Sequence, residues 1–238
     1  LIDKLLTPLT EETDMLHVVT PPPLIHGKHV HNDPLHYTFT SDGSIEGTDC
    51  GCSLVKIAGP KWGGNTIIPL IYSHAARVKP TPYLHPQTNE QTPLEVRRTK
   101  LTSKTIKNWP SALAEAWPIL QALVTTPTNA HILIYTDCQI NIDNWNRTIL
   151  STPSDVQWDG VKDRWMWETL IKPRALARIK AGGSTTLQKI RSHAHEKMKQ
   201  QHEALNALSD TADHEANLAR IQSTTHYTVD IDTLRKAC

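Results

Sequence analysis

The strongest constraint on the fold is a continuous apolar run near the middle of the chain, at residues 131–137 (HILIYTD). An uninterrupted apolar run of this length is typical of a strand that is buried on both faces of a sheet. The run ends in a carboxylate, Asp137, where the chain would leave the sheet. Binding and catalytic residues commonly occupy loops that leave such a rigid scaffold. The run therefore predicts a buried central strand whose C-terminal end carries chemistry.

Three further strands are expected before this run. Residues 36–45 (HYTFTSDGSI) alternate in polarity and reach the turn formers Asp42 and Gly43. Residues 52–58 (CSLVKIA) follow after a short turn, so the two segments should form an antiparallel hairpin. Residues 67–76 (IIPLIYSHAA) are predicted as the third strand, at an edge or a bulge because Pro69 cannot donate to a sheet.

Helices are expected to alternate with the later strands. Residues 111–124 (SALAEAWPILQALV) have helical spacing, and Pro118 should kink this helix or mark its weak point. Further helices are predicted at 138–147, 164–180 and 211–222, with a last strand at 186–192. Antiparallel strands followed by strands that alternate with helices imply an α/β fold, in which helices cover both faces of a mixed sheet.

The flanking segments divide the chain. Residues 1–35 contain three consecutive prolines and no sustained period, which indicates a linker or the tail of a preceding domain. Residues 36–222 are predicted to form the folded domain, with a surface insertion at 77–108 that is rich in Pro, Thr and charge. Residues 223–238 are expected to be a C-terminal tail. The first residue is Leu1 rather than Met, as expected for a piece excised from a longer polyprotein.

Composition narrows the class of protein. The formal net charge is +1, so any basic surface for a nucleic acid must be local. The cysteines fit neither a disulfide framework nor a zinc site, because Cys50 and Cys52 are separated by a single glycine and the other two are far away. No apolar run approaches the ~18 residues of a membrane span, and no signal peptide is visible. We therefore expect an intracellular protein, in cytoplasm or nucleus, with no membrane partner.

Four acidic residues stand in short motifs along the predicted elements. They are Asp42 in TSDGS, Glu115 in AEA, Asp137 in IYTDCQ and Asp213 in ADHEANLA. In this order and on these elements, the motifs resemble those of the ribonuclease H superfamily over about residues 36–222. The resemblance implies a ribonuclease H-like five-stranded mixed sheet, whose first three strands are antiparallel. Taken singly, Asp42 also fits a turn former, and Asp213 a first-turn acid favoured by the helix dipole.

The same acids suit metal-dependent hydrolysis of a phosphodiester. Two Mg²⁺ ions about 3.5–4 Å apart can serve both ends of an in-line displacement. Mg²⁺ prefers hard oxygen ligands and keeps several waters, so a few carboxylates suffice, and Mn²⁺ is an alternative. By analogy with the family, Asp42 would bridge the two ions, Glu115 and Asp137 would share one, and Asp213 would hold the other. Such crowded carboxylates repel one another unless cations or protons neutralise them.

The resemblance also implies residues that act on the substrate. His193 is similar to a family histidine on the loop before the last helix, which assists product release or proton transfer; His195 and His202 are alternatives. Gln139 matches a position that contacts the minor groove in relatives, and Ser44 is expected to contact the strand backbone. Basic and aromatic residues from 145 to 180 can lie on nucleic-acid phosphates, with Trp145 and Arg174 as our candidates. Alternatively, the tryptophans belong to the core.

The expected function is an endonuclease that cuts the RNA strand of RNA–DNA hybrids and leaves 5′-phosphate ends. Recognition would depend on 2′-hydroxyls and groove shape. The long spacing between Asp42 and Glu115 and the CGCS sequence of the second strand indicate a divergent member, such as the ribonuclease H region of a retrotransposon polyprotein. Two alternatives stay open: a binding module that no longer cuts, and a related DNA-cutting nuclease such as a transposase core or resolvase.

Overall fold

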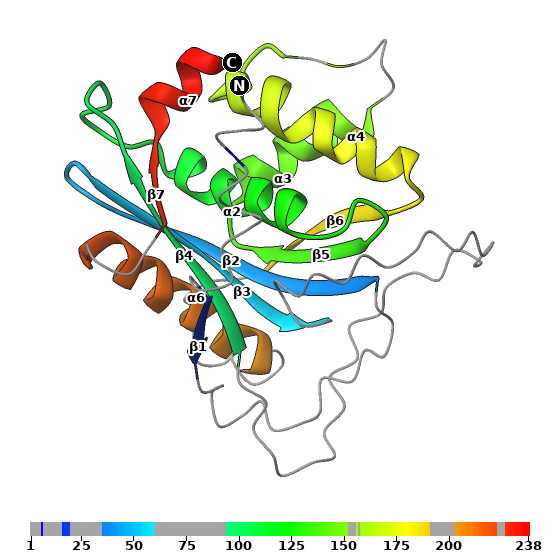
Figure 1. Cartoon of the computed structure of the whole chain (residues 1–238), viewed down its shortest axis with the longest axis horizontal. Coiled ribbons are helices and arrows are strands. Elements are labelled where there is room, and N and C mark those ends of the chain that lie inside the picture. Colours follow the sequence, from blue (N-terminus) through cyan, green and yellow to red (C-terminus); the bar gives the residue numbers. More distant parts are fainter. Residues whose placement is uncertain are drawn as a thin grey trace.

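The computed structural model describes Leu6, Leu16–Val19 and residues 35–59, 94–151, 156, 158–190, 203–222 and 227–238. These segments build one seven-stranded sheet with helices packed on it (Figure 1). The strands are β1 (Leu16–Val19), β2 (His36–Glu46), β3 (Asp49–Ala58), β4 (Leu94–Thr102), β5 (His131–Thr136), β6 (Ser184–Lys189) and β7 (Tyr227–Asp230).

The strand order is β1-β4-β3-β2-β5-β6, and β7 also pairs with β4. The first long strands, β2, β3 and β4, form an antiparallel meander, while β5 and β6 run parallel to β2. The expected α/β fold class, a mixed sheet whose first three long strands are antiparallel, is confirmed. The sheet has more strands than the five expected, because short strands from both ends of the chain pair with β4.

Helices cover both faces of the sheet, as expected (Figure 1). One face carries α2 (Ser111–Thr125), α3 (Gln139–Trp145) with the π-helical turn η2 (Asn146–Leu150), and the π-helical turn η4 (Met166–Ile171), which continues into α4 (Lys172–Lys180). The other face carries α6 (Glu203–Ile221). Helix α2 passes through Pro118 without interruption, and α6 starts earlier than the predicted residue 211.

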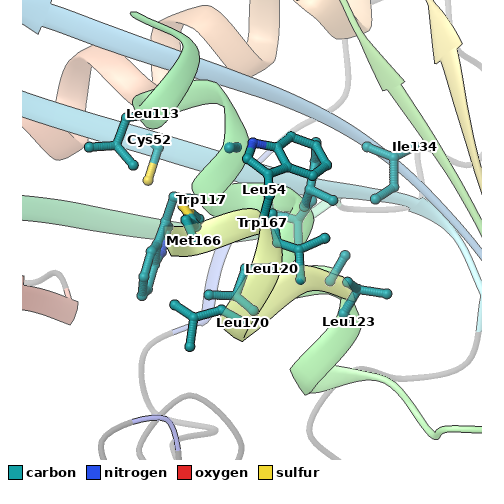
Figure 2. Packing of buried hydrophobic residues seen from close by; sticks show 14 of the residues in the cluster. Cys52, Leu54, Leu113, Trp117, Leu120, Leu123, Ile134, Met166, Trp167 and Leu170 are labelled. Atoms are coloured by element: carbon teal, nitrogen blue, oxygen red, sulfur yellow. The ribbon is translucent and has the colours of Figure 1, made fainter. Parts of the chain in front are cut away.

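Among the described residues, the core on the α2 face is the larger of two apolar clusters. Figure 2 shows Trp117 and Trp167 among leucines from α2 and η4, in one cluster with Leu54 and Ile134 of the sheet. These side chains are fully buried or nearly so. The central run predicted from residues 131–137 is therefore a buried strand, as expected. On the opposite face, a smaller cluster joins Val55, Leu133 and Tyr135 to Leu208 and Ala212 of α6.

The third strand differs from the prediction. It is β4, at Leu94–Thr102, inside the segment that we expected to be a surface insertion, so that part of the expectation is wrong. The predicted strand at 67–76 lies outside the described residues. The polar sequence of β4 (LEVRRTKLT) does not look like a strand of a buried sheet. It can form one because its charged side chains are paired with acids elsewhere in the structure. Arg98 pairs with Glu215 of α6, and Lys100 with Asp49 of β3.

Both flanking segments also carry ordered elements. β1 pairs antiparallel with β4, although we expected residues 1–35 to be a linker or tail. β7 pairs parallel with β4, and α7 (Ile231–Ala237) follows it within the predicted C-terminal tail. The carboxylate of Asp232 accepts hydrogen bonds from the Ser103 hydroxyl and the Lys104 amide, so α7 holds the loop that leads from β4 to α2. The division of the chain into domains remains a prediction.

Within the described residues, none of the helices combines the length and the apolar character that crossing a membrane requires.

Candidate active site

The candidate site lies where the two central parallel strands stop pairing. The register between β2 and β5 ends at Thr40 and Tyr135, although β2 continues to Glu46. Asp42 therefore follows the last paired residue on β2, and Asp137 follows the end of β5. In open α/β sheets, ligands bind in the crevice outside the carboxyl ends of such strands. The fold places two of the four predicted acids at this opening.

Glu115, in the first turns of α2, completes a cluster of three carboxyl groups. One oxygen of each of Asp42, Glu115 and Asp137 lies within 4.8 Å of the other two. Asp42 and Glu115 are each only 8% exposed, whereas Asp137 is half-buried. The cluster thus has two buried members and a third that opens toward solvent. The sequence-based expectation that these three acids converge is confirmed.

A glycine makes this convergence sterically possible. A Cβ atom on Gly43 would lie 2.7 Å from the Ala114 Cβ and 3.1 Å from the Glu115 backbone nitrogen. Real Cβ atoms do not approach other atoms closely enough for the first of these contacts. The absence of a side chain at Gly43 therefore lets the start of α2 rest directly on β2, beside Asp42.

The buried carboxyl groups hold protons more tightly than usual. Burial raises the pKa of Asp42 to about 6; the negative charges of Asp137 and Asp213 add to this, and hydrogen bonds from Glu115 and the Gly43 amide oppose it. Burial also raises the pKa of Glu115 well above its ordinary value, and the neighbouring Asp42 charge adds to the effect. Burial of both acids therefore favours a shared proton on the pair over two adjacent charges. Two acids of this kind share a proton until a cation takes its place.

Asp213 approaches the cluster without joining it. It lies on an exposed position of α6, and its carboxyl group is not part of the three-member group. Its charge nevertheless acts on Asp42, whose pKa it raises. Asp42 is thus a buried acid on which the charges of both Asp137 and Asp213 act. The bridging position that the family resemblance implies for Asp42 remains a prediction.

The donor set fits a hard divalent cation. The Oε2 atom of Glu115 is buried and has no hydrogen-bond partner among the residues that the structure describes. Leaving a buried carboxyl oxygen unpartnered costs free energy, and coordination to a cation would satisfy it. Carboxylate oxygens with solvent on one side suit Mg²⁺ or Mn²⁺, which keep several waters. Asp42, Glu115 and Asp137 would hold such an ion, and Asp213 is a further acid whose charge acts on Asp42.

The predicted substrate residues have different surroundings. Ser44, two residues beyond Asp42, accepts a hydrogen bond from Arg220 Nε of α6 (3.1 Å). Gln139 is exposed at the start of α3 and donates to Asp143 (2.8 Å). Both lie near the carboxylates along the chain, and their role in binding remains a prediction. His193, with its alternatives His195 and His202, lies outside the described residues.

Two candidates from the basic and aromatic stretch are less available to a substrate. Trp145 is only 2% exposed and belongs to the core cluster, so its assignment as a substrate contact is wrong. Arg174 is half-buried, and its Nη1 donates to the carbonyl of Leu170 one turn earlier (2.9 Å). Arg178 from the same stretch is 1% exposed and donates to carbonyls around the end of α2, so it is a structural residue.

Sequence reasoning missed Lys189 at the end of β6. Its Nζ donates to the backbone carbonyl of Asp137 (3.0 Å), which places a cation beside the open edge of the carboxylate cluster. The two residues meet because β5 and β6 are paired in register from His131 and Ser184 to Thr136 and Lys189. Strand pairing between segments far apart in the chain has no local signal, so the sequence alone did not indicate this contact.

Comparisons with known proteins leave the family open. No protein-family model matches the chain, and no curated protein sequence matches it. Among solved structures, the chain is similar to the crystal structure of RNase H1 from the halophilic archaeon Halobacterium salinarum NRC-1. The sequences are 11% identical, the match covers 77% of this chain and 96% of that chain, and the TM-score is 0.38. The fold class therefore rests on the strand order and directions described above.

Proposed function

We propose that this chain is a metal-dependent endonuclease that hydrolyses the RNA strand of RNA–DNA hybrids. The observation that carries the proposal is the cluster of Asp42, Glu115 and Asp137, in which a buried Glu115 oxygen has no hydrogen-bond partner within the described part of the chain. The cluster lies at the carboxyl ends of the central strands, and the order of its acids along the chain resembles that of the ribonuclease H superfamily. Asp213 on α6 is the fourth acid of the proposed site.

The acids of the site would have different roles, according to how deeply each one is buried. When bound, divalent ions would provide an activated water and stabilise the leaving oxygen of the phosphodiester. Asp42, being buried and central, would hold its carboxylate in one orientation; Glu115 would release its proton on loading. Asp137, which is half-buried, would remain accessible from the substrate side. Hydrolysis at this site would leave a 5′-phosphate and a 3′-hydroxyl.

The substrate class is proposed from the resemblance and from the residues that surround the cluster. Gln139 would contact the minor groove and Ser44 the sugar–phosphate backbone, while Lys189 would supply positive charge for phosphates beside Asp137. Recognition of the RNA strand would depend on its 2′-hydroxyl groups, which DNA lacks. The net charge of +1 makes such local cations more important than a global field.

The test is cleavage of labelled substrates by the full chain. Wild type is expected to cut an RNA–DNA hybrid in Mg²⁺ or Mn²⁺, and to be inactive in a chelator. Asp137→Asn should abolish cutting, because the amide keeps the shape of the side chain but loses the charge that binds a cation. Asp210→Asn, an exposed acid on α6, is the matched control and should cut normally.

Two results would contradict the proposal. Metal-dependent cutting that survives Asp137→Asn would show that the cluster is not the catalytic site. Preference for duplex DNA or for a four-way junction over the hybrid would instead favour a DNA-cutting nuclease. Tight binding of the hybrid without turnover, even in Mn²⁺, would identify a nucleic-acid-binding module that does not cut.

A further inference from the structure

A row of three polar residues crosses the sheet beneath α6. Asp42 of β2 pairs in register with Ser53 of β3, and Ser53 pairs with Arg98 of β4. Register partners in antiparallel strands project their side chains from the same face of the sheet. In this row that face is the one covered by α6, which packs on all three strands. The acid at the candidate site is thus one end of a row whose other members meet α6.

Both other members of the row bind α6 within one turn of Asp213. The Ser53 hydroxyl donates to the carbonyl of Ala212 at 2.7 Å, and Ser53 is fully buried. Arg98 Nε donates to Glu215 Oε2 at 2.6 Å, and the side chains of this ion pair are 11% and 3% exposed. Helix α6 is therefore attached to the sheet on both sides of Asp213, by a hydrogen bond before it and a buried ion pair after it.

The helix can approach the sheet this closely because of Gly51. A Cβ atom on Gly51 would lie 2.5 Å from the Ala216 carbonyl oxygen and collide with the backbone at Arg220. The small side chains of Ala212, Ala216 and Ala219 are buried on the same face of the helix. Close packing sets the height of α6 above the sheet, but smooth alanine and glycine surfaces allow a helix to slide or rotate. Directional polar contacts such as those of Ser53 and Arg98 restrict these movements.

Asp213 itself is exposed, so its distance from Asp42 depends on where α6 lies. A buried ion pair contributes little net stability compared with apolar residues of similar size, because both charges lose their hydration. The Arg98–Glu215 pair is therefore better explained by the position that it imposes than by the free energy of unfolding.

We propose that Ser53 and the Arg98–Glu215 pair are positioning residues, which set Asp213 at the distance from Asp42 that the second metal ion of the site requires. This inference rests on the proposed function, since it assumes that Asp213 holds a cation. It does not assume which nucleic acid is cut. The three residues touch neither substrate nor metal in this proposal; they act only through the placement of α6.

The test replaces the ion pair without leaving a buried charge. The double variant Arg98→Met/Glu215→Leu keeps the volume of both side chains and should fold, because apolar replacements of buried ion pairs are commonly neutral or stabilising. The matched control is Lys56→Met/Glu95→Leu, which removes another largely buried ion pair (2.7 Å) that joins β3 to β4 rather than the sheet to α6. Ser53→Ala is a second, independent variant. Asp213→Asn provides the benchmark for loss of the acid itself.

The primary measurement is Mn²⁺ binding to the full chain by isothermal titration calorimetry, with urea unfolding as the measure of stability. Wild type should bind a stronger and a weaker ion. The Arg98→Met/Glu215→Leu variant should weaken the second by about tenfold or more and leave the first within about twofold, as Asp213→Asn does, because the stronger ion depends on Asp42, Glu115 and Asp137. Ser53→Ala should have a smaller effect in the same direction, and the control variant should bind like wild type.

Combining the variants separates positioning from general loosening. In an Asp213→Asn background, Arg98→Met/Glu215→Leu should weaken Mn²⁺ binding no further, since residues that act through one another are not additive. An unchanged second ion in the double variant, or a further loss in the Asp213→Asn background, would overturn the inference. A chain that binds two ions as described but cuts no hybrid would overturn the proposed function and leave the positioning role intact. Reduced binding of both ions together with lower stability would identify a purely structural pair and also overturn it.

Discussion

In the metal-free protein, the raised pKa of Asp42 should lower the folding stability at pH values where this buried carboxyl group is ionised. Replacing Asp42 by asparagine should remove this loss of stability. Burial raises this pKa from 3.8 to about 6. A carboxyl group whose pKa is higher in the folded state favours folding while it is protonated. That contribution is complete below about pH 4 and is lost as pH rises through about 6. Each pKa unit is worth about 1.4 kcal/mol, so the loss for Asp42 amounts to about 3 kcal/mol.

The perturbation is Asp42→Asn. The amide oxygen can still accept the hydrogen bond from the Gly43 amide, which Asp42 Oδ1 accepts at 2.7 Å. Asn carries no charge at any pH, so the variant should not lose folding stability through ionisation at position 42 as pH rises. Urea unfolding in a chelator, from about pH 4 to about pH 8, should therefore show the variant gaining about 3 kcal/mol relative to wild type across this range. Taking the difference between the two proteins cancels the titration of groups that Asp42 does not influence. Glu115 is the exception, because the Asp42 charge raises its pKa, and its contribution adds to the difference in the same direction.

Metal should offset most of this difference. Saturating Mn²⁺ at about 100 times its dissociation constant would stabilise wild type by about 2.7 kcal/mol, and the variant by much less. Asp210→Asn, at an exposed acid of α6, is the control and should follow wild type in both conditions. If the free energies of unfolding of wild type and Asp42→Asn differ by the same amount at every pH from 4 to 8, the reasoning that burial of Asp42 disfavours its charge is refuted.

Three further perturbations test how the structure supports the site. Gly43→Ala should lower the free energy of unfolding by about 1–3 kcal/mol and also weaken Mn²⁺ binding, because the new methyl group would push α2 and Glu115 away from β2; unchanged calorimetric binding would argue against this close contact. Arg178→Met should cost about 3 kcal/mol or more in urea unfolding, since buried carbonyls that it serves, such as those of Leu123 and Ala130, would lose their donor. Asp232→Asn should speed amide exchange in residues 103–106, measured by mass spectrometry, because hydrogen bonds to this carboxylate hold its pKa down at about 2 and hold the loop in place; equal exchange rates would show that the loop is held by other contacts.

Much of the fold was readable from local patterns. The apolar run that ends at Asp137 predicted a buried central strand, and the hairpin of β2 and β3 followed from alternation and a short turn. The acids Asp42, Glu115 and Asp137 could be proposed together because each was predicted at the end or start of a regular element. The predicted turn at Asp42 is wrong, since β2 continues through it to Glu46, but pairing with β5 stops just before it. In α/β folds such ends meet at one edge of the sheet.

The errors share a physical origin. β4 was missed because its charged side chains look solvent-exposed in sequence, although Arg97 and Arg98 lie largely within the structure, and Arg98 is neutralised by Glu215 on a distant helix. Trp145 was assigned to the substrate because a tryptophan near basic residues is found both in protein cores and on nucleic-acid-binding surfaces. Only the packing in the folded chain distinguishes the two, and it places Trp145 in the core. β1 and β7 were missed because four-residue strands have too short a period to detect.

The sequence by itself determined which residues have the chemistry for a divalent-metal site and on which local elements they lie. Helical and strand periods depend on neighbours within a few positions, so these features are written locally. Only the tertiary structure decided that Glu115 is buried against Asp42, with an oxygen that has no partner among the described residues. It also decided that α2 and α6 pack directly on the sheet at Gly43 and Gly51. The ion pair of Arg98 with α6, close to Asp213, likewise appears only in the folded chain. Burial, close approach and ion pairing arise between segments far apart in the chain, and these contacts set both the pKa values and the distances between the acids.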